Sequence, residues 1–384
     1  MASSAQPAAG AMQKPSLADA WFAWRDRLLA NASFQRWAAS FPPTRFIARR
    51  RARGLFDLVA GFVYSQVLQA AVRMHLFDIL AEGPQTAAQL APRLGLGEDA
   101  ALRLLAAAVS LRLVQRRSGQ RYGLGVLGAP MVGNTAVAAM VEHHATLYAD
   151  LRDPVALLRG DALNPALAQY WPYASADAPG SLSPERVAEY SALMSASQPL
   201  VADQVIDAHP FARHRVLLDV GGGEGTFLCR VAERVPKLQL LLFDLPAVAE
   251  RARERFAAAG LASRTQVHGG SFFDDALPTG VDLVTLVRVA FDHSDARVLQ
   301  LLQAVRRAMA PGGVLLLAEP MAATPGAEAM GDAYFAFYLL AMGRGRARSA
   351  AQLTQLLEAA GFGQVRLLPT HLPLQTQVMR ATPV

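Results

Sequence analysis

The alternation of hydrophobic and polar positions divides the chain into a mainly helical first part and a second part in which strand and helix patterns alternate. From about Arg186 onward, apolar runs such as RVLLDV, LQLLLFDL, DLVTLVRV and VLLLAE are separated by amphipathic stretches, one of them a helix over Ala296–Met309. Parallel strands joined by helices form a doubly wound α/β sheet. We therefore predict an α/β domain over residues 186–384, with ligands bound at the carboxyl ends of its strands.

The preceding residues, 56–185, carry mostly helical patterns. A long helix is predicted to end at Arg73, and LFDIL, TAAQLAPRLGL and DAALRLLAAAVSLRLV then predict three helices before a hairpin that turns at Ser118-Gly119. This order is typical of a winged helix-turn-helix. Its third helix offers Arg103 and little else polar, whereas base readout needs several polar or basic side chains. We expect this domain to serve packing, dimerisation and substrate lining, and to bind no nucleic acid.

Residues 1–55 form a basic aromatic helical extension. They contain nine lysines and arginines against two aspartates, so they hold the whole basic excess of a chain whose formal net charge is +6. Their aromatic side chains are Trp21, Phe22, Trp24, Phe34, Trp37, Phe41 and Phe46. Basic charge beside interfacial aromatics is typical of a helix on an anionic membrane surface, and amphipathicity alone is equally typical of packing against protein. Both interpretations stay open.

Neither a signal peptide nor a membrane span is predicted. The most apolar stretch, LFDLVAGFVYSQVLQAAVR, is interrupted by charged and amide side chains, and the first twenty residues lack an apolar core. We expect a cytoplasmic protein that makes peripheral membrane contact if the extension binds lipid. The single cysteine, Cys229, cannot form an internal disulfide and argues against cysteine-based zinc sites, and we expect no resident metal.

The stretch DVGGGEG places Asp219 at a strand end and three glycines in the turn that opens a helix. A dinucleotide fingerprint starting at Gly221 would need glycine at position 226, which is threonine, and no Walker lysine follows. Asp244 ends the next strand in LLFDLP, where a carboxylate can accept both hydroxyls of a ribose. In GGSFFD, Phe272 can cover an adenine, with Ser271 or a backbone group at its edge. A site for an adenosine without a phosphate, with free helix N-terminal amides for a carboxylate, fits S-adenosyl-L-methionine.

The same motifs, with RVAFDHSD, APGGVLLLAEP and the late GRGRARS...LLEAAGF, resemble the plant-type small-molecule O-methyltransferases over about residues 56–384. The resemblance implies a Rossmann-like domain that uses S-adenosylmethionine, preceded by a winged-helix dimerisation domain in a homodimer. It places these residues in the cofactor site: Asp219, Gly221, Gly223, Asp244, Ser271, Phe272 and Arg288. It also places Met194 near the methyl donor.

In that family the segment after the fourth strand usually reads His-Asp-Trp, and its histidine is the general base. Here the triplet is Phe291-Asp292-His293, and a phenylalanine ring cannot accept a proton. His293 and Glu319, the latter matching the family glutamate beside the base, are therefore the candidate catalytic residues. An apolar ring at the usual base position favours an acceptor that is itself mostly hydrocarbon.

The N-terminal segment ASFQRWAASFPPTRFIARRRARGLFDLVAGFVYSQVL and the segment HHATLYADLRDPVALLRG resemble carotenoid hydroxyl O-methyltransferases of the demethylspheroidene or hydroxyneurosporene type. This resemblance implies that the acceptor is the tertiary C-1 hydroxyl of a linear carotenoid, collected at a photosynthetic membrane. We expect the acceptor site to be lined by Met194, Phe291, His144, Tyr148 and Tyr338.

Three alternatives remain open. A bacteriochlorophyllide C-20 methyltransferase would need a ligand for the magnesium of its chlorin, for which His143 and His144 are candidates; otherwise they are a structural pair on a helix. An O-methyltransferase for a polyketide or another phenol would fit the same fold, although the missing base makes it less natural. A winged-helix regulator that binds S-adenosylmethionine without turnover would require DNA binding.

Overall fold

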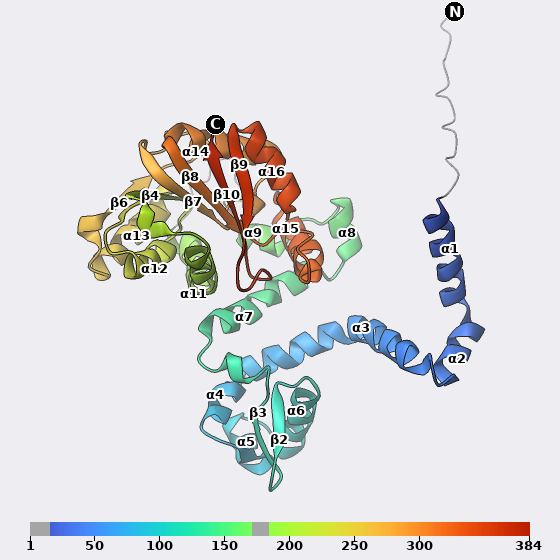
Figure 1. The fold of residues 1–384 in the computed structure, drawn as a ribbon. Helices are drawn as coiled ribbons and strands as arrows, with labels where there is room; N and C mark the ends of the chain where they lie inside the picture. Colours follow the sequence, from blue (N-terminus) through green and yellow to red (C-terminus); the bar gives the residue numbers. More distant parts are fainter. Residues whose placement is uncertain (1–15, 171–183) are drawn as a thin grey trace, which may run out of the picture. The chain divides into compact units, whose positions relative to one another are not determined.

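The computed structural model of the protein describes residues 16–170 and 184–384, and it divides into two compact units between Val126 and Leu127 (Figure 1). The unit before this division is helical, with one small sheet. Its elements are α1 (Leu17–Ala30), α2 (Ala32–Ser40), α3 (Arg45–Arg73), α4 (Leu76–Ala81), β1 (Gln85–Thr86), α5 (Ala87–Arg93), α6 (Glu98–Ser110), β2 (Val114–Arg117) and β3 (Arg121–Leu124).

Local capping explains where several of these helices begin. Ser16 and Asp19 form a reciprocal capping box at the start of α1, and Thr86 and Gln89 form another at the start of α5. The order α4, α5, α6 and the antiparallel β2–β3 pair matches the predicted winged helix-turn-helix, with β1 added beside β3.

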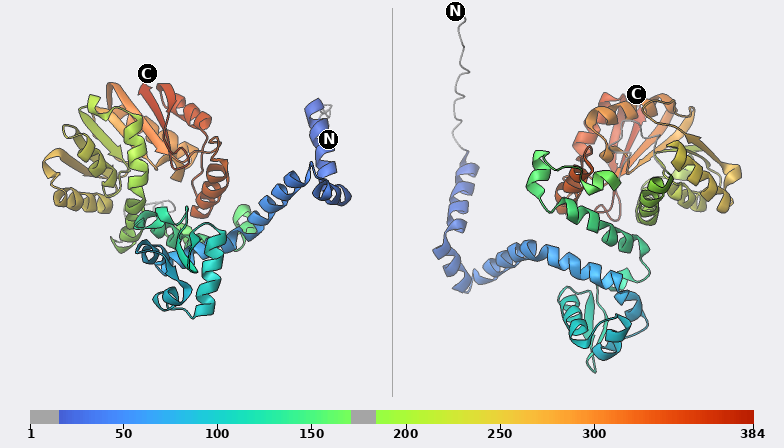
Figure 2. Two further views of the ribbon diagram at one scale, coloured as in Figure 1. Left: turned by 60° about the horizontal axis from the view of Figure 1, so that its bottom comes forward. Right: turned by 180° about the vertical axis from the view of Figure 1, so that it is seen from behind.

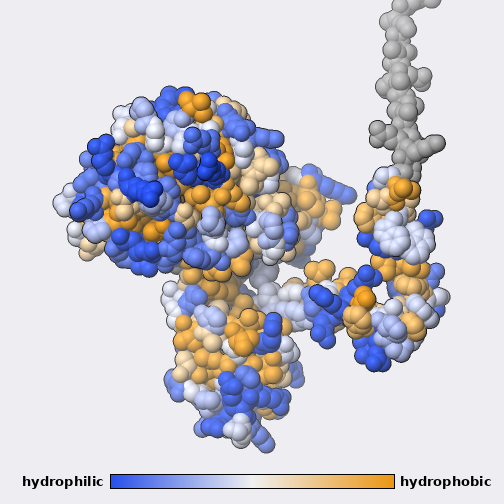
Figure 3. All heavy atoms as spheres, viewed as in Figure 1, coloured by the Kyte–Doolittle hydropathy of each residue, from blue (hydrophilic) through white to orange (hydrophobic). Residues whose placement is uncertain are grey.

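Much of the apolar surface of α1 to α3 is exposed. Trp21 stacks on Trp24 with 4.9 Å between ring centroids, and Trp37 stacks on Phe41 at 5.0 Å. In α3, Leu58 and Phe62 are 82% and 70% exposed. Figure 3 shows apolar and basic side chains adjacent along these helices. The helices thus leave apolar side chains exposed beside basic ones.

The helix α3 is long and apolar enough, by length and composition alone, to cross a membrane, and little of it is buried. The sequence had predicted no span, because charged and amide residues interrupt this stretch. One such helix is weak evidence of a span, since core helices and signal sequences share these properties.

The unit after the division joins a group of helices to a large sheet. The helices before the sheet are α7 (Thr135–Asp150), α8 (Pro154–Arg159), α9 (Ala166–Tyr170) and α11 (Pro184–Ala208). Those that follow are α12 (Thr226–Arg234), α13 (Pro246–Ala258), α14 (Asp295–Ala308), α15 (Ala336–Met342) and α16 (Ala350–Ala359). A π-helix, Ala329–Phe335, leads into α15.

The sheet has seven strands in the order β6-β5-β4-β7-β8-β10-β9 (Figure 1). Their bounds are β4 (Val216–Val220), β5 (Gln239–Asp244), β6 (Thr265–Gly269), β7 (Val281–Val287), β8 (Met309–Glu319), β9 (Phe362–Leu368) and β10 (Gln377–Pro383). The first five strands by sequence are the predicted parallel strands, whereas β10 runs antiparallel to both β8 and β9. The prediction of a parallel sheet is therefore corrected to a mixed sheet.

Both faces of the sheet are covered by helices (Figure 2). Along β4, Leu217 packs with residues of α11, α12 and α13, and its neighbour Leu218 packs with residues of α14 and α16. Successive strand residues point to opposite faces, so a strand buried on both sides needs an unbroken apolar run. This is why RVLLDV and its counterparts show no polar alternation.

Candidate active site

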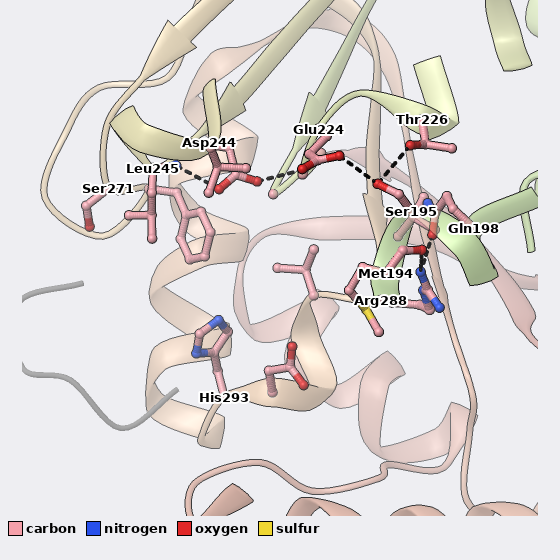
Figure 4. A pocket seen from close by; sticks show the side chains of 18 of the residues that line it. Met194, Ser195, Gln198, Glu224, Thr226, Asp244, Leu245, Ser271, Arg288 and His293 are labelled. Atoms are coloured by element: carbon pink, nitrogen blue, oxygen red, sulfur yellow. Dashed lines mark hydrogen bonds between the residues drawn. The ribbon is translucent and has the colours of Figure 1, made fainter. Parts of the chain in front are cut away.

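A pocket lies at the carboxyl ends of the central parallel strands, within the unit formed by residues 127–384 (Figure 4). Loops after β4 to β7 and one stretch of α11 supply its walls. The lining residues are Met194, Ser195, Gln198, Gly221, Gly222, Gly223, Glu224, Thr226, Asp244, Leu245, Val248, Ser271, Phe272, Phe273, Val287, Arg288, Val289, Asp292 and His293. Most of the predicted cofactor residues are thereby brought together.

The loop after β4 needs glycine for two separate reasons. Gly221, Gly223 and Gly225 all have positive φ angles, of 70°, 58° and 79°, a conformation that residues with a Cβ adopt only under strain. A Cβ on Gly221 would lie 2.7 Å from a methyl carbon of Val289, and one on Gly225 would run into the ring of Phe256. The backbone of this loop therefore forms the floor of the pocket.

Asp244 connects the end of β5 to the glycine loop. Its carboxylate accepts the backbone N–H groups of Gly223 and Leu245, each at 2.7 Å. Burial raises the pKa of Asp244 to about 6, against the lowering effect of these two hydrogen bonds. The side chain still lines the pocket (Figure 4), so it can accept further donors.

Asp219 lies beneath the glycine loop and is not among the lining residues. It is 1% exposed and accepts the hydroxyl of Thr285 at 2.6 Å, and burial raises its pKa to about 7. A Cβ on Gly222 would lie 2.7 Å from a carboxylate oxygen of Asp219. This residue supports the loop from below.

The loop after β6 contributes Ser271, Phe272 and Phe273. The Ser271 hydroxyl donates to Asp274 at 2.8 Å, and the ring of Phe272 makes an edge contact with the ring of His293 at 5.7 Å between centroids. Phe273 contacts the same imidazole at 5.1 Å. Aromatic rings thus surround His293 on this side of the pocket.

Arg288 connects the end of β7 to α11. Its guanidinium donates to the Ser197 hydroxyl at 2.8 Å, to the Met194 carbonyl at 3.2 Å and to the Gln198 side chain. Its φ angle is 59°, which is strained for a residue with a side chain and persists only where surrounding contacts hold it. Figure 4 shows Met194, Gln198 and Arg288 together on one wall.

Glu224 was not predicted as a site residue, although it stands inside the quoted GGGEG. It forms ion pairs with Arg251 at 2.5 Å and Arg255 at 2.6 Å and accepts the Ser195 hydroxyl at 3.1 Å. Burial would raise the pKa of Glu224, but these hydrogen bonds outweigh it and the pKa is lowered. The sequence held one signal for such a partner: Arg251 and Arg255 are four positions apart, so they lie on one face of a helix and can pair with the same carboxylate.

After β7, Ala290–Asp292 form a short 3₁₀ turn, and His293 is the extended residue that caps it. Asp292 and His293 line the pocket. Phe291 is 8% exposed and packs in a cluster with Tyr338, Leu339 and Met342, with Met194 at its edge. An apolar wall therefore adjoins the pocket at the position where the resemblance to plant-type O-methyltransferases implied a histidine.

The two candidate catalytic residues are placed differently. His293 faces the pocket, and burial, with help from Arg297 and Arg348, lowers its pKa to about 4, so its imidazole is neutral. Glu319 is fully buried, does not line the pocket and accepts the backbone N–H of Phe291 at 3.0 Å. Burial raises the pKa of Glu319 to about 8.

Two histidine–tyrosine pairs lie behind Phe291. His143 hydrogen-bonds the hydroxyl of Tyr338, and His144 that of Tyr334, each at 2.7 Å. Tyr148 contacts the ring of His144 at 6.3 Å between centroids. Burial lowers the pKa of both histidines, to about 4 for His143. These residues do not line the pocket, but the cluster that contains Phe291 includes Tyr338 and, at its edge, Tyr334.

Comparison with known proteins agrees with this geometry. A family model of an O-methyltransferase domain matches residues 148–363, and a model of an O-methyltransferase dimerisation domain matches residues 56–141. The chain is 45% identical to a demethylspheroidene O-methyltransferase of Cereibacter sphaeroides over 92% of this chain and 93% of that protein. It is 32% identical to an acetylserotonin O-methyltransferase of Mus musculus, covering 83% and 85% of the two chains.

Solved structures agree as well. CalO1, a methyltransferase of calicheamicin biosynthesis solved in its SAH-bound form, superposes with a TM-score of 0.72 at 27% identity, covering 87% of this chain and 98% of that one. The dimerisation model begins at residue 56, directly after the predicted boundary at residue 55, whereas the predicted boundary at residue 185 falls inside the O-methyltransferase model and inside the second compact unit. Both domain boundaries stay a prediction.

Proposed function

Because this chain belongs to the S-adenosylmethionine-dependent O-methyltransferases, we propose that it methylates the tertiary C-1 hydroxyl of a linear hydroxycarotenoid of the demethylspheroidene or hydroxyneurosporene type. The observation that carries the proposal is Phe291, whose ring packs beside the cofactor pocket with Tyr338, Leu339 and Met342, where it gives a hydrocarbon acceptor an apolar wall. The 45% identity to a demethylspheroidene O-methyltransferase supports it.

The pocket fits the cofactor by its donors and acceptors. Asp244 remains open to the pocket and would accept the two ribose hydroxyls, and Phe272 would cover the adenine with Ser271 at its edge. The backbone of Gly221 and Gly223 would approach the amino-acid end closely. Arg288 would act on that end together with Gln198, and Asp219 would act indirectly by supporting the loop.

When bound, S-adenosylmethionine supplies an electrophilic methyl group on a positively charged sulfur. The acceptor oxygen would form a C–O bond as the donor's C–S bond breaks, and the chain would have to align that oxygen and receive the hydroxyl proton. Because the donor's positive charge would be neutralised, positioning and exclusion of water by the pocket would supply much of the acceleration. The apolar wall around Phe291, Tyr338 and Met194, with His144 and Tyr148 behind it, would hold the acceptor chain.

The proton would go to His293 or Glu319. His293 suits the role because its imidazole is neutral and faces the pocket. Glu319 would act from behind the turn and only in its ionised form, since it is buried, bonds the Phe291 amide and has a pKa raised by burial to about 8. The double variant His293→Ala, Glu319→Gln should lose most of the methyl transfer at unchanged cofactor affinity. Wild-type turnover in this variant would remove both residues from proton transfer.

The test of the acceptor uses the whole protein and labelled S-adenosylmethionine. Detergent-dispersed 1-hydroxy carotenoids, a bacteriochlorophyllide and a simple phenol are offered separately. We expect label in the carotenoid alone. Label in the chlorin would favour the C-20 methyltransferase, and label in the phenol would favour a polyketide-type acceptor. Either result would overturn the carotenoid assignment while leaving the family intact.

The family's dimerisation domain supports a homodimer, and we further propose that the helices of residues 16–55 contact an anionic membrane from the cytoplasmic side. Exposed Trp21 and Trp24 of α1, together with the arginine-rich start of α3, suit such a surface. The protein should float with anionic vesicles and not with zwitterionic ones, and alkaline carbonate should extract it. Equal flotation with both vesicles would refute the charge argument, and resistance to carbonate would indicate a spanning α3.

A further inference from the structure

Arg348 is a fully buried arginine in the segment between α15 and α16, with 0% exposure. Its guanidinium donates to the carbonyl oxygen of Ala290 at 3.0 Å and to that of His293 at 2.6 Å. It also forms an ion pair with Asp295 at 2.8 Å. A buried charge is expensive unless it is paired and hydrogen-bonded, so these bonds specify its position closely.

The two carbonyl groups are the two ends of the 290–293 turn. Within the turn the hydrogen bonds are long, 3.3 Å from Asp292 to Val289 and 3.2 Å from His293 to Ala290. Bonds from outside hold the backbone of Phe291 within the turn: Glu319 accepts its N–H, and the backbone N–H of Arg346 donates to its carbonyl oxygen at 2.9 Å. The conformation of this turn is therefore imposed by its surroundings.

The turn presents two side chains, Asp292 and His293, to the pocket and a third, Phe291, to the apolar wall. A shift of the turn would displace all three from the reacting groups at once. Misplacement by about 1 Å can cost roughly 100-fold in rate.

We propose that Arg348 is a positioning residue for methyl transfer, which holds the 290–293 turn by its two terminal carbonyl groups so that Asp292, His293 and Phe291 face the reacting groups. This inference rests on the proposed function in one respect: its test needs an acceptor that the wild-type protein methylates. Arg348 also contributes, after burial and Arg297, to the lowered pKa of His293, which keeps the imidazole neutral.

Arg346 provides a matched control. Its side chain pairs with the same Asp295 at 2.6 Å and is 52% exposed. Its hydrogen bond to the turn is made by its backbone N–H, which alanine keeps. We expect Arg348→Lys and Arg348→Ala to lower kcat by about 10- to 100-fold, because a lysine cannot bridge both carbonyl groups and Asp295. The Kd for S-adenosylmethionine should stay near the wild-type value, since Asp244 and the glycine loop are untouched. Arg346→Ala should keep nearly the wild-type kcat.

Chemical rescue separates positioning from general folding. Millimolar guanidinium should restore part of the kcat of Arg348→Ala, whereas the same concentration of urea should not. Wild-type kcat in a folded Arg348→Ala protein, or an equal loss in Arg346→Ala, would overturn the inference. If the wild-type protein methylated no hydroxycarotenoid, the proposed acceptor would be overturned instead. The kcat of each variant would then be compared with that of the wild type on the acceptor that is methylated.

Gly345→Ala tests the same idea if the Arg348 variants do not fold. Gly345 lies against the turn: a Cβ there would collide with the Phe291 carbonyl oxygen and lie 3.0 Å from Cα of Asp292. The φ angle of Gly345 is not positive, so alanine strains only this contact. We expect a reduced kcat with little change in cofactor Kd, and an unchanged kcat would contradict the proposed role of the turn's position.

Discussion

Replacing Asp244 by asparagine should separate cofactor affinity from stability. The carboxylate accepts two backbone N–H groups at 2.7 Å and still faces the pocket. Asparagine has only one acceptor oxygen, so its NH₂ group would face one of the donors that the second carboxylate oxygen accepts. A hydrogen bond to a charged group contributes about 1.5–3 kcal/mol, and tenfold in affinity corresponds to about 1.4 kcal/mol. Loss of one such bond to the ribose should therefore raise the Kd for S-adenosylmethionine roughly 10- to 150-fold.

The effect on stability should be small because two contributions oppose each other. Burial raises the pKa of Asp244 from 3.8 to about 6, a difference equivalent to roughly 3 kcal/mol. The folded pKa lies above the unfolded one, so the ionised carboxyl destabilises the fold increasingly from about pH 4 to 6 and fully above that range. A neutral amide avoids this penalty while losing a backbone bond of similar size. The melting temperature at about pH 8 should therefore change little.

Calorimetric titration with S-adenosylmethionine and thermal denaturation measure the two quantities. Asp282→Asn is the matched control, because Asp282 also accepts two consecutive backbone N–H groups, those of Arg215 at 2.9 Å and Val216 at 2.8 Å, and it does not line the pocket. It should alter stability without changing the Kd. An unchanged Kd in Asp244→Asn, or an equal change in Asp282→Asn, would refute the reasoning.

Three further changes test individual parts of the site. Lowering the pH through about 6 should weaken S-adenosylmethionine binding, because protonated Asp244 loses acceptor capacity; a constant Kd across this range would contradict that. Gly225→Ala should abolish cofactor binding or folding, because the added Cβ would collide with the ring of Phe256. Gly223→Ala meets open space and should lower the free energy of unfolding by only about 1–2 kcal/mol, the strain of its positive φ angle. An equal loss of stability in both variants on thermal denaturation would contradict this prediction. Phe291→Ala should lower the free energy of unfolding in urea by about 3–5 kcal/mol, and a much smaller loss would show that its ring is not core.

The order and type of most elements could be predicted from the sequence because doubly buried strands and amphipathic helices leave distinct patterns. The strands β9 and β10 were not predicted. Their apolar residues are mixed with charged ones such as Arg366 and Arg380, and their antiparallel pairing depends on contacts remote in the chain.

The gathering of Gly221, Gly223, Asp244, Ser271, Phe272 and Arg288 around one pocket could also be predicted, because each of their motifs directly follows a strand. The contacts of Arg288 with α11 could not, since they join residues about ninety positions apart. The pairing of His143 with Tyr338 spans almost two hundred positions. The burial of Glu319 under the 290–293 turn likewise depends on how β8 lies beside β7.

The most direct test of the central claim is to locate the transferred methyl group. The protein is incubated with trideuteriomethyl-labelled S-adenosylmethionine and a 1-hydroxy carotenoid, and the product is fragmented by mass spectrometry. Label on the oxygen at C-1 is the predicted result. Label on a carbon atom, or none in the carotenoid while a phenol is methylated, would contradict the claim.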